Sequence, residues 1–250
     1  MVTNHDNLSS HPTTTGTHAA SPTAVPPSDD ALAAVAAMSI GVLGGTGPQG
    51  LGLARRFALA GHRVVLGSRS AERAAAAAVP LADEGLPVTG ADNAGAAGAD
   101  LVVVAVPYVG HEALLEGLRA ELAGKIVIDC VNPLGFDKQG SYALDVAAGS
   151  AAQEAAAILP ASTVVAAFHH LSAVLLADPG VERVETDVLV LGDDRSATDV
   201  VQALTDRIPG MRGIYAGRLR NARQVEALTA NLISINRRYQ AHAGLRVTDV

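Results

Sequence analysis

The chain has 250 residues, of which 49% are apolar and only 3% are aromatic, and its formal net charge is −7 at pH 7. This length predicts one main domain with a smaller companion, and the negative charge argues against nucleic acid or anionic lipid as a partner. A single cysteine, Cys130, excludes an internal disulfide and suits a reducing compartment.

Residues 1–38 differ in composition from the rest of the chain. They are rich in Thr, Ser, Pro and Ala and show no hydrophobic periodicity, so we expect a disordered N-terminal tail. No Lys or Arg precedes Arg55, which argues against a signal or transit peptide, and no apolar run reaches membrane-spanning length. These features predict a cytoplasmic protein that has no membrane partner.

From residue 39 onward, short apolar runs typical of buried parallel strands alternate with alanine-rich stretches typical of helices. The predicted strands are residues 39–44, 62–68, 101–107, 125–131, 163–170 and 187–193, with a short strand near residues 213–217. The predicted helices are residues 47–61, 70–79, 110–122, 195–208 and 221–240. This alternation predicts an α/β fold, with a doubly wound parallel sheet in residues 39–160 and a smaller C-terminal α/β domain in residues 161–250.

The stretch "SIGVLGGTGPQGLG" (39–52) places three glycines in a G-x-G-x-x-G pattern between a predicted strand and a predicted helix. Gly45 would allow the tight turn, Gly47 would let backbone approach a pyrophosphate, and Gly50 would let helix and strand pack closely. The helix N-terminus would direct positive partial charge at the phosphates. The pattern in this context predicts a Rossmann-type dinucleotide site rather than a purely structural turn.

The next predicted strand ends in "GSRSAER", where NAD-binding chains carry an acidic residue that bonds the adenosine ribose. Here Ser68 and Arg69 occupy that position, and Arg73 follows one helical turn later. No carboxylate would repel a 2′-phosphate, and two guanidinium groups would hold it. The sequence therefore favours NADP over NAD.

The familiar catalytic pairs of dinucleotide enzymes are missing. Short-chain dehydrogenases need a Lys four residues after a Tyr, and none follows Tyr108, Tyr142, Tyr215 or Tyr239. The only two lysines, Lys125 and Lys138, fall in a predicted strand and a predicted loop, so the helix-borne lysine of hydroxyacid dehydrogenases is absent as well.

Metal and thiol chemistry find no support either. His169 and His170 are adjacent in a predicted strand, so they would point to opposite faces and could not chelate one metal. Cys130, inside an apolar strand, is expected to be a buried hydrophobe rather than a reactive thiol. What remains is hydride transfer between two bound cofactors, which needs no metal and no essential catalytic side chain.

The chain resembles the NADPH-dependent coenzyme F-420 reductases (8-hydroxy-5-deazaflavin:NADP oxidoreductases). The resemblance begins with "IGVLGGTGPQGLGLARRFALAGHRVVLGSR" and continues through "VVVAVPYVGH", "KIVIDCVNPL", "VVAAFHHLSA" and "AGRLRNARQVEALTANLISIN". It covers most of residues 39–245, and its C-terminal part is more specific than the glycine loop. Ser172 stands where a proline is familiar in this family.

The resemblance implies NADP(H) as cofactor and coenzyme F-420 as co-substrate, in a cleft between the two domains. Residues implied to hold the dinucleotide are Gly45, Thr46, Gly47, Pro48, Gln49 and Gly50 at the pyrophosphate, Ser68, Arg69 and Arg73 at the 2′-phosphate, and Val106, Asn132 and Ala173 beside the nicotinamide. His169 is implied to lie beside the deazaflavin. It could hydrogen-bond the ring, relay a proton, or be a core histidine satisfied by backbone.

Two other functions stay open from the sequence. One is NADPH-dependent reduction of a small imine or carbonyl substrate, which would need an acid aimed into the cleft. The other is a non-catalytic NADP sensor. We also expect a homodimer. Separately, Val225, Leu228, Leu232 and Ile235 form an apolar face on the last predicted helix, which could pack on the cleft or on another subunit.

Overall fold

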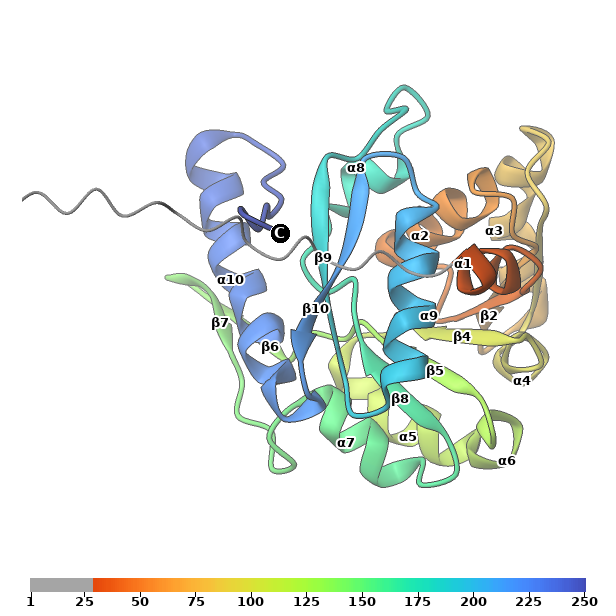
Figure 1. Ribbon diagram of the computed structural model, residues 1–250, viewed down its shortest axis with the longest axis horizontal. Helices are drawn as coiled ribbons and strands as arrows, with labels where there is room; N and C mark the ends of the chain where they lie inside the picture. Colours follow the sequence, from red (N-terminus) through yellow and green to blue (C-terminus); the bar gives the residue numbers. More distant parts are fainter. Residues whose placement is uncertain (1–28) are drawn as a thin grey trace, which may run out of the picture. The chain divides into compact units, whose positions relative to one another are not determined.

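The computed structural model describes residues 29–250, in which eight strands form one sheet in the order β10-β9-β8-β5-β4-β1-β2-β3 (Figure 1). The six strands from β3 to β8 are parallel, and β9 pairs antiparallel with β8. The strands are β1 (Ile40–Leu43), β2 (Val64–Ser68), β3 (Val88–Asp92), β4 (Leu101–Val104), β5 (Ile126–Asp129), β8 (Thr163–Ala166), β9 (Thr186–Gly192) and β10 (Met211–Gly217). This order confirms the predicted α/β, Rossmann-type fold.

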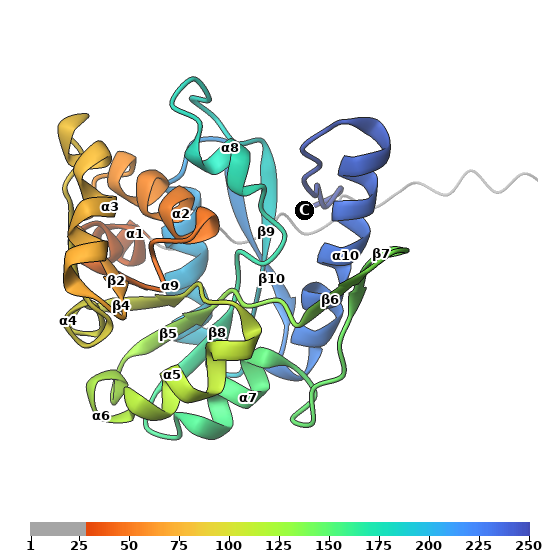
Figure 2. The same ribbon diagram turned by 180° about the vertical axis from the view of Figure 1, so that it is seen from behind.

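Helices cover both faces of this sheet (Figure 2). The helices are α1 (Asp29–Ala36), α2 (Pro48–Leu59), α3 (Ala71–Asp83), α4 (Asn93–Ala97), α5 (His111–Gly117), α6 (Arg119–Leu122), α7 (Ala151–Ile158), α8 (Ala173–Ala177), α9 (Arg195–Asp206) and α10 (Ala222–Tyr239). Alternate residues of β4 face opposite sides: Leu101 and Val103 pack with α2 and α9, and Val102 and Val104 pack with α5 and α7. The strands are therefore buried on both faces, as their continuous apolar runs predict.

The direction of the sheet reverses after β8. Only Val165 and Ala166 pair with β9, opposite Gly192 and Leu191, so most of β9 extends beyond the carboxyl end of β8. β10 pairs parallel with β9 along its length. The last two strands therefore overhang the edge of the sheet at which the parallel strands end.

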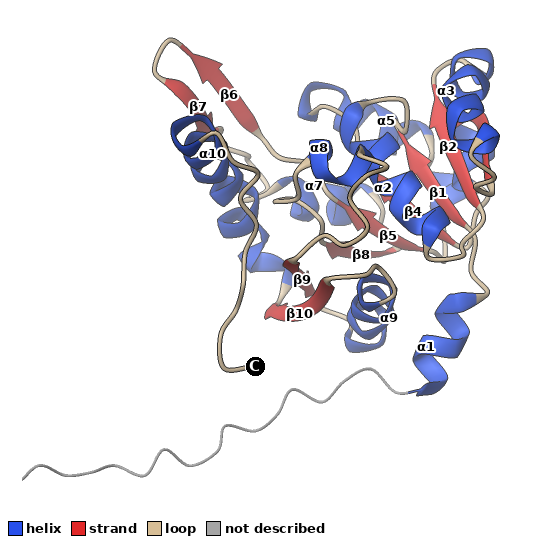
Figure 3. Cartoon of the chain, turned by 90° about the horizontal axis from the view of Figure 1, so that it is seen from above, coloured by secondary structure: helices blue, strands red, loops and turns tan. Residues whose placement is uncertain are grey.

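A separate hairpin, β6 (Leu134–Asp137) and β7 (Gly140–Ala143), follows β5 and lies beside α10 (Figure 3). The Ser141 hydroxyl donates a hydrogen bond to the carbonyl of Ala230, at 3.1 Å, which ties the hairpin to the helix. Tyr142 lies across from Gly135, where a Cβ would come within 2.4 Å of the tyrosine ring. The missing side chain thus makes room for the aromatic ring.

The structure differs from several sequence expectations. Residues 29–36 were expected in the disordered tail, but they form α1, because "DDALAAVA" is composed mostly of good helix formers and Val35 is buried in the core. Residues 1–28 lie outside the described part. β3 and the hairpin were not predicted. The domain boundary at residue 160 stays a prediction, since strands from 39–160 and 161–250 pair in one sheet.

The strand expected at residues 163–170 ends at Ala166. His169 and His170 therefore lie in a turn, so the prediction that they point to opposite faces of a strand is wrong. Within residues 29–250, no helix has both the length and the apolar character required to cross a membrane.

Candidate functional site

The glycine loop runs from the end of β1 to the first turn of α2. Gly44 takes a φ of +68°, a conformation that favours glycine, so the tight turn lies one residue before the glycine expected to make it. A Cβ on Gly50 would lie 2.7 Å from the Cα of Gly45, which accounts for the close packing of helix on strand. Gly47 precedes α2, and Pro48 begins it in the first turn, where a missing N–H costs nothing.

This loop forms one side of a pocket of about 390 Å³ at the carboxyl ends of β1, β2 and β4. Lining residues include Thr46, Gly47, Ser68, Arg69, Arg73 and Val106, all singled out from the sequence. Ligands of open α/β sheets bind at this edge, beside the strand at which the strand order reverses. Here that strand is β1, with β2 on one side and β4 on the other. The pocket therefore has the position and size expected of a dinucleotide site.

The pocket carries two positive charges that the protein itself does not neutralise. Arg69 and Arg73 are exposed, and neither guanidinium has an ion-pair partner among the described residues. Ser68, at the end of β2, is buried, and Ser70 caps α3 by accepting a hydrogen bond from the Arg73 amide at 3.2 Å. The cap fixes the first turn of α3, and with it the backbone that carries both arginines.

Part of the lining was not predicted. Asn93, the first residue of α4, accepts a hydrogen bond from the Gly44 amide at 3.4 Å and faces the glycine loop. The opposite wall contains Pro107, Val109 and Gly110, in the segment after β4. No local motif marks these residues, because they reach the pocket only through the order of strands in the sheet.

The remaining predicted residues meet next to this pocket rather than in its lining. The side-chain amide of Asn132 donates to the carbonyl of His169 at 2.8 Å, and the Thr229 hydroxyl donates to the same carbonyl at 3.2 Å. Gln49 donates to the carbonyl of Phe168 at 3.2 Å. Residues 168–169 thus connect the start of α2, the segment after β5 and helix α10; Thr229 was not predicted from the sequence.

The backbone at this junction is strained. Phe168 has a φ of +64°, a left-handed conformation that is rare for a bulky residue. Such strain is concentrated at functional sites, where neighbouring contacts hold it in place. Ala173 begins α8 five residues later, and α8 packs against α2.

The imidazole of His169 is buried, and neither ring nitrogen has a hydrogen-bond partner within the described chain. Burial lowers the pKa of His169 to about 4, so the ring is neutral at pH 7. Buried polar atoms without partners are uncommon and call for an explanation, such as a ligand or water. The alternative of a core histidine satisfied by backbone does not hold for this ring.

Cys130 is buried, as predicted, and its thiol donates a hydrogen bond to the carbonyl of Val104 at 3.1 Å. Burial raises the pKa of this thiol, which keeps it protonated and unreactive. In the described residues, no three His, Cys, Asp or Glu side chains are grouped so that they could hold a metal ion.

Comparison with protein families gives a match over residues 39–133 to the family described as NADP oxidoreductase coenzyme F420-dependent. Over 226 residues, the chain is 41% identical to an F420-dependent NADP reductase of Methanothermobacter thermautotrophicus; the match covers 86% of this chain and 97% of that protein.

Two solved structures share the fold. One, described as an F420-dependent NADP reductase from Arthrobacter sp. FB24, has a TM-score of 0.72 and 30% identity, over 84% of this chain and 99% of the other. An imine reductase from Bacillus cereus has a TM-score of 0.58 and 18% identity, over 81% and 63% of the two chains. The similarity to the imine reductase shows a shared fold and nothing more.

Proposed function

The chain belongs to the F420-dependent NADP reductase family, and on that premise we propose that its glycine-loop pocket binds NADP(H). The protein is an oxidoreductase that transfers hydride between NADP(H) and coenzyme F420. The two cofactors supply the hydride chemistry, so the chain contributes binding, alignment of the reacting faces and exclusion of water.

The observation that carries the NADP assignment is the pair of unpaired arginines at the end of β2. Arg69 and Arg73 line the pocket without a neutralising carboxylate, and the adjacent Ser68 offers a hydroxyl. A 2′-phosphate would satisfy both guanidinium groups through charge-assisted hydrogen bonds. Gly47 leaves the other end of the pocket open, since a Cβ there would find no atom closer than 3.7 Å.

The nicotinamide would extend along Val106 toward Asn132 and Ala173, and the deazaflavin would stack on it beside residues 168–169. His169 fits this arrangement, because its two unpartnered ring nitrogens need a hydrogen-bonding group that the chain does not supply. A neutral imidazole with a pKa of about 4 suits a hydrogen bond to the deazaflavin better than proton donation at pH 7.

The other functions left open by the sequence have less support. An imine or carbonyl reductase would need an acid directed at the substrate. The Tyr108 hydroxyl, near the pocket wall, instead donates to Glu154 at 3.4 Å. A non-catalytic sensor would need a water, rather than a second cofactor, to partner the buried nitrogens of His169.

A direct assay tests the proposed function. The protein is mixed with NADPH and oxidised coenzyme F420, and the visible absorbance of the deazaflavin is followed. We expect rapid loss of this absorbance, and a slower reaction for a variant that combines Arg69→Ala with Arg73→Ala when NADPH is below saturation. Unchanged absorbance with NADPH bound would contradict the proposal and favour the sensor.

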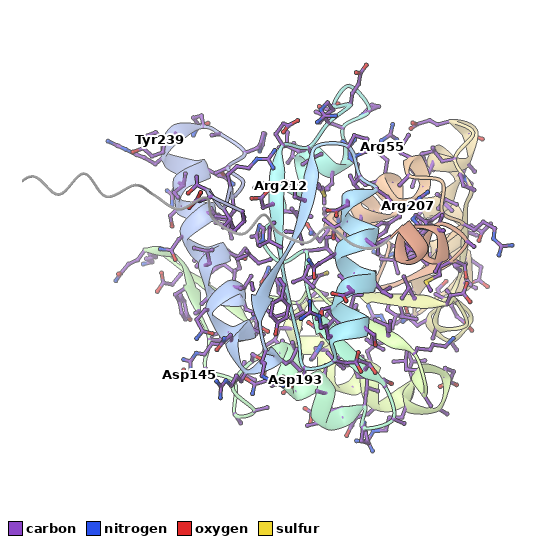
Figure 4. The ribbon with its side chains drawn as sticks, in the orientation of Figure 1. Arg55, Asp145, Asp193, Arg207, Arg212 and Tyr239 are labelled. Carbon is purple, nitrogen blue, oxygen red and sulfur yellow. The ribbon has the colours of Figure 1, made fainter. Side chains whose placement is uncertain are left out.

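We further propose that the enzyme is a cytoplasmic homodimer. Two adjacent elements, the β6–β7 hairpin and α10, carry five exposed large apolar side chains: Phe136, Tyr142, Ile233, Ile235 and Tyr239. Tyr239 projects from the C-terminal end of α10 (Figure 4). Apolar side chains gathered in this way are typical of an interface, and a hairpin that pairs with no other strand gains stability from a second copy.

A further inference from the structure

A buried ionic cluster lies behind the wall of the nucleotide pocket. His111 is fully buried, and its Nε2 lies 2.6 Å from Oδ2 of Asp129, whose side chain is also fully buried. The other ring nitrogen, Nδ1, lies 3.0 Å from Oε2 of Glu154. Each ring nitrogen therefore faces a carboxylate, an arrangement that only the doubly protonated, cationic ring satisfies with two N–H donors.

This histidine stands at the end of the pocket wall. The wall, residues 105–110, leaves the sheet after Val104, and none of its six residues is buried; Val109 is 97% exposed. His111 is the first buried residue after Val104. Ala105, Val106 and Tyr108 pack only partly against the core, so His111 is the first fully buried anchor of the wall after β4.

The two carboxylates come from the elements that border the same site. Asp129 is the last residue of β5, three residues before Asn132, and its Oδ1 accepts the Val131 amide at 3.0 Å. Glu154 lies in the first turn of α7. The cluster therefore joins the C-terminal end of the wall to the segment that leads to the proposed nicotinamide side.

We propose that His111 is a positioning residue for NADP(H): clamped as a cation between Asp129 and Glu154, it holds the 105–110 wall against the bound dinucleotide. This inference rests on the proposed function, because it takes the pocket to be the NADP(H) site. His111 itself touches neither the pocket nor the reacting atoms; it acts through Pro107, Val109 and Gly110, which line the pocket.

The charges around the ring decide its protonation. Burial lowers the pKa of His111, but the hydrogen bonds and charges of Asp129 and Glu154 outweigh burial and raise it to about 9. Glu226, on α10, adds a nearby acidic group, and Tyr108 faces the ring at 6.1 Å between centroids. Above this pKa the neutral ring keeps only one N–H, so one of its two bonds is lost.

The first test measures the Kd of NADPH by its fluorescence. His111→Gln, which removes the cation, should raise this Kd about tenfold, the loss expected for one charge-assisted hydrogen bond. Glu154→Gln, the milder change, should raise it by a smaller factor. Asp187→Asn is the matched control, because Asp187 is a buried, ion-paired carboxylate on β9, away from the wall.

The pH dependence separates positioning from general stability. The Kd of the wild type should rise from about pH 7 to about pH 10 as His111 loses its proton, and that of His111→Gln should stay flat in this range. Equal slopes in the two proteins, or a lower melting temperature of His111→Gln with an unchanged Kd, would overturn the inference.

Hydrogen exchange without ligand keeps this test independent of the proposed function. Amides of the wall residues other than Pro107 should exchange faster in both His111→Gln and Glu154→Gln, but not in Asp187→Asn. Unchanged exchange of the wall in both cluster variants would overturn the inference. If the wild type failed to bind NADPH while the wall still loosened as expected, the proposed function would fail and the mechanical role of His111 would stand.

Discussion

At the residue scale, the proposed preference for NADP over NAD depends on Arg69 and Arg73. Both lie at the rim of the pocket and carry charge that no described carboxylate neutralises. Arg69→Ala or Arg73→Ala should weaken NADP binding by about 1.5–3 kcal/mol, the range of a hydrogen bond to a charged group, and NAD binding much less. Isothermal titration with both nucleotides measures the difference.

Arg119→Ala serves as the control, because Arg119 is an exposed arginine on α6 outside the pocket. It should leave both affinities unchanged. If the pocket variants lost affinity for NAD and NADP equally, these side chains would not be reading the extra phosphate.

Among single residues, the sequence predicted those pocket residues that belong to short motifs. Gly47 belongs to one short motif, Ser68, Arg69 and Arg73 belong to another, and all four residues line the pocket. Asn93 and the residues after Pro107 escaped prediction because strand order, not sequence distance, brings them together. His111 escaped for a related reason, since its two carboxylates lie 18 and 43 residues away.

At the scale of elements, a buried carboxylate of α10 links this helix to α7, in addition to the apolar side chains that the two helices share in the core. Glu226 accepts the Ala151 and Ala152 amides at 3.0 and 3.1 Å, which caps the start of α7 from a different helix. Glu226→Ala should lower the free energy of unfolding by about 1–2 kcal/mol, the cost of a lost cap, as measured by urea denaturation.

A further variant, Glu226→Gln, adds a pH signature. Burial raises the pKa of Glu226 to about 7, so the folded protein binds this proton more tightly than the unfolded chain, whose carboxyl has a pKa near 4.5. This group's contribution to stability therefore falls as the pH rises between these values. The stability difference between wild type and Glu226→Gln should shrink from about pH 5 to about pH 8, and a growing difference would contradict this.

The elements found from the sequence were those with long apolar or amphipathic patterns. β3 was missed because "VTGAD" carries a glycine and an aspartate and is only partly buried. The hairpin was missed because β6 and β7 have four residues each and expose half of them. The strand at residues 163–170 was predicted too long, because the apolar run "VVAAF" continues for two residues after the strand ends at Ala166.

On the scale of the whole molecule, the exposed hairpin and α10 predict self-association. Light scattering should give twice the chain mass of 25.3 kDa for the wild type, and a mass near that of one chain for Phe136→Glu combined with Ile235→Glu. Both changes place charge on apolar surface that a C2 interface would bury.

Val79→Glu is the control, since the exposure of Val79 lies between those of Phe136 and Ile235, but Val79 is on α3. The Val79→Glu variant should still have the mass of a dimer. A wild type that scatters as one chain would contradict the dimer.

The doubly wound parallel sheet followed from the sequence, because the strand–helix–strand alternation specifies βαβ units. The antiparallel direction of β9 was not predicted, because a hydrophobic pattern carries no information on strand direction. The location of the pocket, beside the glycine loop at the end of β1, was therefore predictable from the first half of the chain. The overhanging strands, and the path by which α10 reaches residue 169, were visible only in the structure.

The buried thiol of Cys130, directly after β5, offers a way to measure how often the centre of the sheet opens. Cys130 is the single cysteine, and its buried thiol is bonded to the Val104 carbonyl at the end of β4. We therefore expect an alkylating reagent to reach the sulfur when β4 and β5 separate. The rate of alkylation thus reports how often the centre of the molecule opens, and any slowing on addition of either cofactor reports how firmly that cofactor closes it.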